Sequence, residues 1–120
     1  MTAHPIVHIE IPAHDREVSA NFYSALFGWE MQHHPEMQYT TFAAPPGPGG
    51  GLATIDGDNM KQGQVLIHVG TDDVDASLNR AVELGGSIVV PKSEIPGIGW
   101  FGIFADPVGN RIAVFKDANS

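Results

Sequence analysis

The sequence predicts an α+β fold of two tandem βαβββ modules that form a curved mixed sheet around a cavity. Three observations support this prediction: each half of the chain begins with an alternating apolar strand, continues with an acidic helix cap and an amphipathic helix, and ends that helix at a glycine. When Gly28 is aligned with Gly85, Asp15 falls on Asp72, which indicates an internal duplication. We expect a single domain over residues 1–120, with module one at about 4–56 and module two at about 64–117.

Composition narrows the class of protein. The chain has 120 residues, 6 Lys plus Arg against 14 Asp plus Glu, a formal net charge of −8 and no cysteine. Such a charge argues against nucleic acid and anionic membranes as partners, and it fits either simple solubility or attraction of a cationic ligand. Because no secretion signal or membrane-spanning apolar run is seen, we expect a cytoplasmic protein.

The first strand of module one is predicted over Ile6–Ile11, where apolar and other residues alternate. This alternation places His8 and Glu10 on one face and Val7 on the other. We expect Pro12 to end the strand, since proline has no N–H to donate.

The helix of module one is predicted to begin after the cap Asp15 and to end at Gly28. Its apolar stripe consists of Val18, Phe22 and Leu26, spaced four residues apart. We expect this stripe to pack under the sheet, which would make Phe22 a buried ring.

The remainder of module one is read as three strands, a loop and a linker. The strands are predicted over Trp29–His34, Gln38–Ala43 and Leu52–Ile55, the glycine- and proline-rich loop over Pro45–Gly51, and a polar linker over Asp56–Gly63.

Module two repeats the same order, with Asp72 or Asp73 as the helix cap. Strands are predicted over residues 65–70 and Ser87–Pro91, a helical stripe at Val74, Leu78, Ala81 and Val82, and a loop over Lys92–Gly99. A hairpin then joins Trp100–Ala105 to Arg111–Phe115 through a turn at Asp106–Gly109, whose aspartate, proline and glycine favour a tight turn.

The faces not covered by the helices are expected to line the cavity. Strand parity places these residues there: His8, Glu10, Leu66, His68, Arg111, Ala113 and Phe115. At least one of Trp100 and Phe101 is expected to join them and to stack on a flat or cationic ligand, although simple packing explains both rings equally well.

Three of these side chains carry reactive groups. His8 and Glu10 share a strand face, and His68 has a comparable place in module two. Together they can bind Zn²⁺, Mn²⁺ or Fe²⁺ or act as acid and base. The alternative is that each histidine is a hydrogen-bonded core or cavity-lining residue. The adjacent pair His33 and His34 is expected to lie in a solvated loop.

The duplicated pattern, the segment Asn21–Trp29 and the ending Asp106–Ile112 together resemble the vicinal oxygen chelate superfamily, which includes glyoxalase I, bleomycin-resistance and extradiol dioxygenase proteins. The resemblance implies a divalent metal held by the first and last strands of each module. Carried over by spacing, the first ligand falls on His8, the second on Leu66, and the usual glutamate on Ala113. The remaining position falls within Leu52–Ile55, which offers no carboxylate.

The resemblance therefore implies a small-molecule-binding protein without the usual four-ligand metal site. The alternative is an enzyme (a lyase, isomerase or dioxygenase) that uses a displaced metal such as Zn, Ni, Mn or Fe with His8 as one ligand, or uses His8, Glu10 and His68 as acid–base groups. We expect a small ligand of cationic or aromatic character, and a homodimer.

Overall fold

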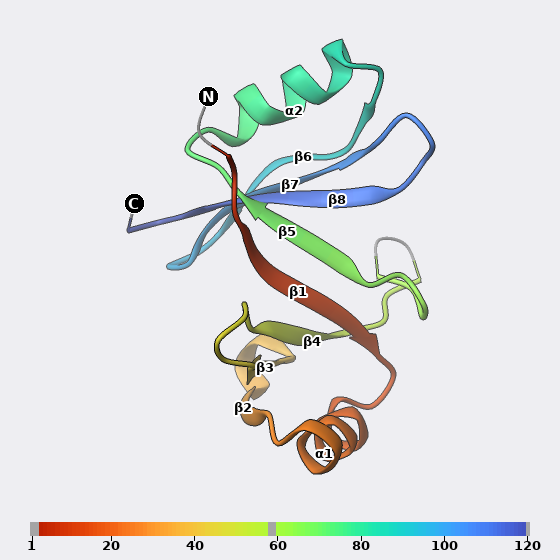
Figure 1. Ribbon diagram of the computed structural model, residues 1–120, viewed down its shortest axis with the longest axis vertical. Coiled ribbons are helices and arrows are strands. Elements are labelled where there is room, and N and C mark those ends of the chain that lie inside the picture. Colours follow the sequence, from red (N-terminus) through yellow and green to blue (C-terminus); the bar gives the residue numbers. More distant parts are fainter. Residues whose placement is uncertain (1–2, 58–59, 120) are drawn as a thin grey trace. The chain divides into compact units, whose positions relative to one another are not determined.

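The computed structural model describes residues 3–57 and 60–119 and confirms the α+β class (Figure 1). The elements are β1 (Ile6–Ala13), α1 (Arg16–Phe27), β2 (Glu30–His34), the short 3-10 helix η1 (Pro35–Met37), β3 (Tyr39–Ala43), β4 (Gly50–Thr54), β5 (Leu66–Gly70), α2 (Val74–Glu83), β6 (Ser87–Ile95), β7 (Gly99–Ala105) and β8 (Arg111–Asp117). The order βαβββ thus occurs twice, as the sequence predicts. Of the expected linker, Asp58 and Asn59 lie outside the described residues.

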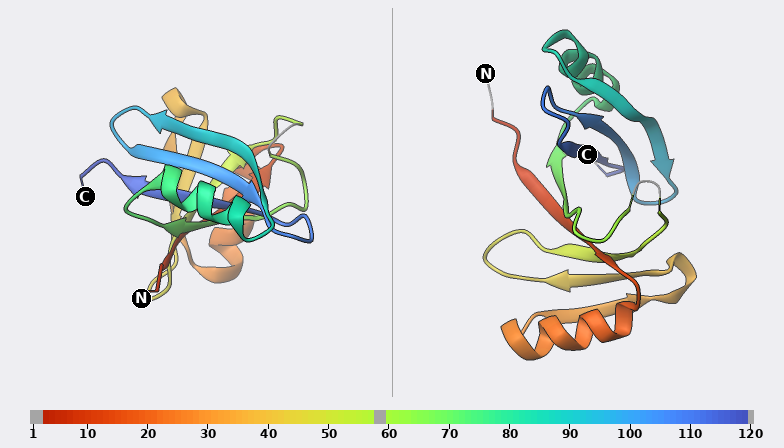
Figure 2. Two further views of the ribbon diagram at one scale, coloured as in Figure 1. Left: turned by 90° about the horizontal axis from the view of Figure 1, so that it is seen from above. Right: turned by 90° about the vertical axis from the view of Figure 1, so that its right-hand side faces the viewer.

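The chain divides into two compact units, one of His8–Leu66 and the other of Met1–Val7 with Ile67–Ser120. In the first unit the strand order is β2-β3-β4-β1, with β1 and β4 parallel and the other pairs antiparallel. In the second the order is β5-β8-β7-β6, with β5 and β8 parallel. Each unit therefore contains a mixed group of strands and one α-helix among its described residues (Figure 2). None of the helices in the described residues is long and apolar enough to span a membrane.

Helix α1 begins and ends where the sequence predicts. The Asp15 carboxylate accepts hydrogen bonds from the N–H groups of Glu17 and Val18, at 3.0 and 3.2 Å. At the other end Gly28 adopts φ of 73°, a left-handed conformation that glycine reaches without strain, and its N–H donates to the Ser24 carbonyl. These two residues therefore fix the length of α1.

The face that α1 buries differs from the prediction. Phe22 is 59% exposed and Val18 and Leu26 are equally open, whereas Ala20 is only 2% exposed. The small Ala20 side chain lets α1 approach the strands closely, and Tyr23 packs with it against the core cluster. The expectation of a buried Phe22 ring is therefore wrong: four-residue spacing defined an apolar stripe but did not show what it contacts.

Two strand boundaries in the first unit also differ from the prediction. β1 continues through Pro12 to Ala13. The N–H of Ile9 donates to the Gly49 carbonyl, on the side of β1 that faces β4. Pro12 lies three residues further on, so its nitrogen faces the opposite edge of the strand, and its lack of an N–H breaks no hydrogen bond to β4. Gly50 and Gly51 belong to β4 and not to the expected loop.

In the second unit α2 covers β6, β7 and β8. Asp73, one of the two predicted caps, accepts from the Ala76 N–H at 3.0 Å. Val74 and Leu78 are each 1% exposed and pack against Val114 of β8, as the apolar stripe predicts. β6 extends to Ile95, so much of the loop expected after Pro91 is strand.

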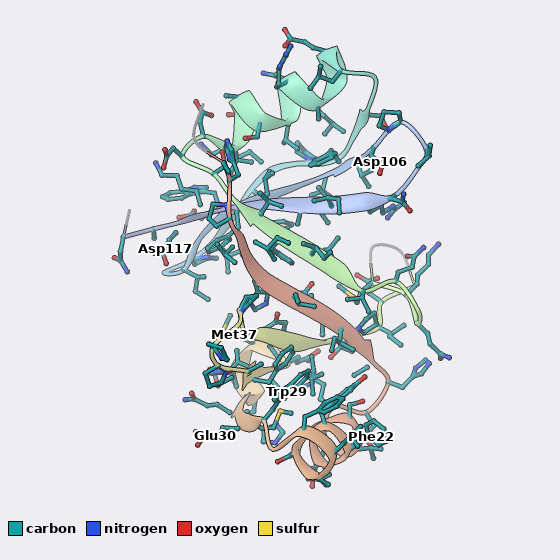
Figure 3. The ribbon with its side chains drawn as sticks, viewed as in Figure 1. Phe22, Trp29, Glu30, Met37, Asp106 and Asp117 are labelled. Carbon is teal, nitrogen blue, oxygen red and sulfur yellow. The ribbon has the colours of Figure 1, made fainter. Side chains whose placement is uncertain are left out.

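The predicted hairpin is confirmed, with β7 and β8 antiparallel. At its turn the Asp106 carboxylate accepts from the N–H groups of Val108 and Asn110, at 3.0 and 2.9 Å (Figure 3). The hydrogen bonds from Asn110 are the main reason that the pKa of Asp106 lies below its usual value. The turn thus holds the register in which Ala113 lies beside His68 of β5.

Candidate functional site

The first unit brings His8 and Glu10 together through a residue that the sequence analysis missed. The hydroxyl of Tyr39 on β3 donates to Glu10 Oε2 at 2.7 Å, and its oxygen lies 2.6 Å from His8 Nε2. His8 and Tyr39 have nearly parallel rings, with centroids 6.2 Å apart. We call these three residues the Glu10–Tyr39–His8 array.

Gly51 explains how Tyr39 reaches β1 from β3. β4 lies between the two strands, with Gly51 in register with Glu10 on one side and with Thr41 on the other. A β-carbon at position 51 would overlap the Tyr39 ring, so only glycine leaves room for it. A glycine inside a strand marks the close approach of another group, and this signal could have revealed the array from the sequence.

The hydrogen bonds determine which nitrogen of His8 carries a proton. Tyr39 has one hydroxyl proton and donates it to Glu10, so its oxygen can only accept from His8. His8 Nε2 is therefore the protonated nitrogen, and Nδ1 is the acceptor in the neutral ring. The array is a directed chain of hydrogen bonds that runs from imidazole through phenol to carboxylate.

Burial shifts the titration of all three groups. It lowers the pKa of His8 and raises the pKa of Glu10, although the hydrogen bond from Tyr39 opposes part of the second shift. Burial also raises the pKa of Tyr39, and the charge of Glu10 and the hydrogen bond to it add to this rise. Near neutral pH, His8 and Tyr39 are therefore both neutral.

A second hydrogen-bonded group lies on β2 and β3. His33 Nδ1 is 2.8 Å from the hydroxyl of Thr40, and His34 Nε2 is 3.1 Å from that of Thr41. The two rings thus have different partners, as strand parity requires. They lie in β2, however, and not in the expected solvated loop.

The predicted residues of the second unit lie around His68. This histidine is 8% exposed and stands in register with Ala113, which is fully buried. Arg111 lies two residues before Ala113 on β8 and Phe115 lies two residues after it, so the three side chains share one face of the strand. Phe101 on β7 is in register with Phe115. Leu66, the first residue of β5, belongs to the first unit and is buried at 6% exposure.

Trp100 does not lie on that face. It packs against Val74, Leu78 and Val114 beneath α2, and the ammonium group of Lys92 lies 5.7 Å from the centre of its ring. The prediction that Trp100 lines the ligand site is therefore wrong. It follows from strand parity, because Trp100 and Phe101 are adjacent and must face opposite ways.

A separate open groove of about 500 Å³ lies at the start of α2. Its lining residues are Asp72, Asp73, Val74, Asp75, Ala76, Asn79, Lys92 and Lys116. Asp73 is the helix cap and Asp75 lies in the first helical turn, where a carboxylate favours the helix dipole. Stabilisation of α2 explains these two acidic side chains.

The four-ligand metal site that the resemblance implies does not fit the residues present. On β4, the positions in register with Glu10 and Pro12 are Gly51 and Ala53, and neither has a ligating atom. Ala113 likewise has none. Among residues 3–57 and 60–119, no three His, Asp or Glu side chains are grouped so as to hold a metal ion.

Two βαβββ modules are the fold of glyoxalase, bleomycin resistance and dioxygenase proteins, also called vicinal oxygen chelate proteins, and the family match reported below places the chain among them. A member from Vibrio splendidus 12B01 superposes with a TM-score of 0.67 at 17% identity, over 96% of this chain and all of that one. Methylmalonyl-CoA epimerase from Mycobacterium tuberculosis gives 0.66 at 16% identity, over 94% of this chain and 87% of the other. At these identities the likeness concerns the fold.

Within this superfamily, the chain belongs to the glyoxalase-like domain family, whose profile matches residues 7–115. It is 32% identical to a glyoxylase-like domain-containing protein of Didymella fabae, over 88% of each chain. It is 29% identical to the anthracycline biosynthesis protein DnrV of Streptomyces peucetius, over 85% of this chain and 43% of that one. The chain thus spans less than half the length of this bacterial relative.

Proposed function

We propose that this chain is a small-molecule-binding domain that binds its ligand at the Glu10–Tyr39–His8 array. The observation that supports this most is the phenol that joins a carboxylate and an imidazole at 2.7 and 2.6 Å. Partly buried polar groups of this kind add little to stability, because apolar side chains of similar volume are often as stable. Binding of a ligand is a reason for the sequence to have them.

The ligand is bound without the family's metal site in this proposal. Ala113 and the segment Leu52–Ile55, where the resemblance calls for carboxylate ligands, have no carboxylate, and Tyr39 already bonds to both reactive side chains of β1. Recognition therefore depends on hydrogen bonds and charge. A ligand with a hydroxyl, a carbonyl or an amino group matches the donors and acceptors of the array.

We propose a cationic aromatic molecule as the ligand. The carboxylate of Glu10 and the net charge of −8 both favour a cation. The relative DnrV is named as an anthracycline biosynthesis protein, and anthracyclines are flat polycyclic aromatic compounds. An anthracycline with an amino sugar combines both properties.

A thermal-shift screen tests this proposal. An anthracycline with an amino sugar should raise the melting temperature more than its uncharged aglycone does. Glu10→Gln should abolish the difference, whereas Glu36→Gln, which removes an exposed carboxylate of η1, should keep it. An equal effect of both compounds on the wild type would contradict the cationic ligand, and an unchanged response of Glu10→Gln would contradict the site.

The shifts in the pKa of Glu10 and His8, together with their link through Tyr39, favour acid–base catalysis as a second function. Burial makes Glu10 a stronger base than a free carboxylate, and Tyr39 couples it to His8. Such a group can remove a proton from the carbon next to a carbonyl. If Glu10 acts as such a base, a ketone-containing ligand that is incubated with the protein in heavy water should gain deuterium at that carbon. The Glu10→Gln variant should not support this exchange.

A further inference from the structure

The outer face of α1 carries an apolar surface that neither the core nor the ligand site uses. Val18, Phe22 and Leu26 are 64%, 59% and 58% exposed, and Phe27 at the end of the helix is 57% exposed. We call Val18, Phe22 and Leu26 the α1 ridge. Phe22 is labelled on α1 in Figure 3.

The ridge and Phe27 form one continuous surface. The ridge residues are four apart and so line up along the helix. The ring of Phe22 contacts that of Tyr23 at 5.2 Å between centroids, and Tyr23 in turn stacks on Phe27 at 6.3 Å. The apolar surface therefore extends from the first turn of α1 to its last residue.

The area of this surface fits a small stable dimer. The three ridge side chains are more than half exposed and offer roughly 100 Å² of apolar surface each, or about 300 Å² in all. Because an interface is only about 60% apolar, this corresponds to roughly 500 Å² for each copy and about 1,000 Å² for a pair. That value reaches the roughly 1,000 Å² that a specific protein interface needs.

Charge favours a second copy of the same chain as the occupant. The chain has a net charge of −8, so most approaches of two copies are repulsive. Val18–Phe27 contains no Asp, Glu, Lys or Arg, and two copies can meet there without repulsion. In an antiparallel pair, the positive N-terminal end of each α1 also lies near the negative C-terminal end of the other.

We propose that the α1 ridge is the self-association surface of this protein, with two α1 helices packed antiparallel about a two-fold axis. In such an interface Phe22 meets Phe22 of the second copy, and Val18 meets Leu26. Rows of residues four apart interlock with one another in the commonest mode of helix packing. This proposal is independent of the ligand site, whose residues lie on β1 and β3.

Light scattering during size-exclusion chromatography tests the proposal. The wild type should elute with twice the chain mass of 12.8 kDa. Leu26→Asp should raise the dissociation constant about tenfold or more, while Val108→Asp, at an apolar residue that is 83% exposed in the β7–β8 turn, should leave the dimer intact. A monomeric wild type at about 100 µM, or a Leu26→Asp protein with the same dissociation constant as the wild type, would overturn the proposal.

A cysteine cross-link tests the geometry separately. The chain has no cysteine, so Phe22→Cys introduces its only thiol. Across the two-fold axis the two thiols should form a disulfide under mild oxidation, because the Cα atoms fall within the distance that a disulfide spans. Val108→Cys should cross-link much more slowly. Equal rates for the two variants would overturn the antiparallel arrangement.

Discussion

The ring of Tyr39 lies over the α-carbon of Gly51, in the space that a side chain at position 51 would occupy. This relationship between β3 and β4 allows the phenol to reach β1 and to join His8 to Glu10. The candidate site therefore depends as much on a missing side chain as on its three polar ones.

Replacement of Gly51 by alanine should displace the Tyr39 ring and disrupt the array. Overpacking of this kind costs roughly 1–3 kcal/mol of unfolding free energy, as urea denaturation would show. Gly47→Ala is the control, because a β-carbon there meets nothing closer than the Ala44 carbonyl oxygen at 3.6 Å. Equal stability of the two variants would show that Tyr39 does not need the space above Gly51.

Removal of the Tyr39 hydroxyl should break the hydrogen-bonded link between His8 and Glu10 and lower the free energy of unfolding. Tyr39→Phe leaves both partners without their shared hydrogen bonds, which should cost about 1–2 kcal/mol in equilibrium unfolding. Tyr23→Phe is the matched control: the Tyr23 ring packs among aromatic rings, and its substitution should change stability by less than about 0.5 kcal/mol. A Tyr39→Phe protein as stable as this control would count against the array.

The pKa of Glu10 predicts how stability depends on pH. Because burial raises this pKa above 4.5, folding favours the protonated carboxyl. The stabilising contribution is fully present below pH 4.5 and is lost as the pH rises through the folded-state pKa. The wild type should therefore lose stability relative to Glu10→Gln in urea denaturation as the pH rises above 4.5. A constant difference, or a wild type that gains, would contradict the shift.

Stability should also distinguish the two helices. Phe22→Ala should cost less than about 1 kcal/mol in dilute solution, because the ring is 59% exposed. Leu78→Ala should cost roughly 2–5 kcal/mol, since Leu78 is buried beneath α2. Urea denaturation of both variants checks the comparison, and a larger loss for Phe22→Ala would mean that α1 buries its ridge.

Much of the fold could be predicted from the sequence, because caps and alternation are local signals. Asp15 and Gly28 bound α1, and the Asp106 turn forms the hairpin as predicted. The buried face of α1 could not be predicted in the same way. Periodicity locates an apolar stripe, but only packing shows that the sheet accepts the small side of the helix at Ala20.

The candidate site could be predicted only in part. Strand parity correctly placed His8 and Glu10 on one face of β1, since successive residues alternate. Their link through Tyr39 depends on the register of β3 and β4, to which residues far apart in the chain contribute. The glycines and prolines of Pro45–Gly51 predict a loop, and this pattern conceals the strand glycine at position 51.

The purified protein should contain no stoichiometric transition metal. Ala113 and the segment Leu52–Ile55 have no carboxylate, and His8 is already bonded to Tyr39. Elemental analysis after a chelator wash checks this prediction. About one equivalent of Zn, Ni, Mn or Fe that survives the wash would contradict it and would favour a metal-dependent enzyme.

Carbon-13 NMR of labelled tyrosine rings tests the proposed ligand site most directly. The chain has only two tyrosines, so Tyr39→Phe and Tyr23→Phe assign both signals. Titration with the amino-sugar anthracycline should move the Tyr39 signal in a saturable manner and leave the Tyr23 signal in place. Saturable binding that leaves the Tyr39 signal unchanged would contradict a ligand site at the Glu10–Tyr39–His8 array.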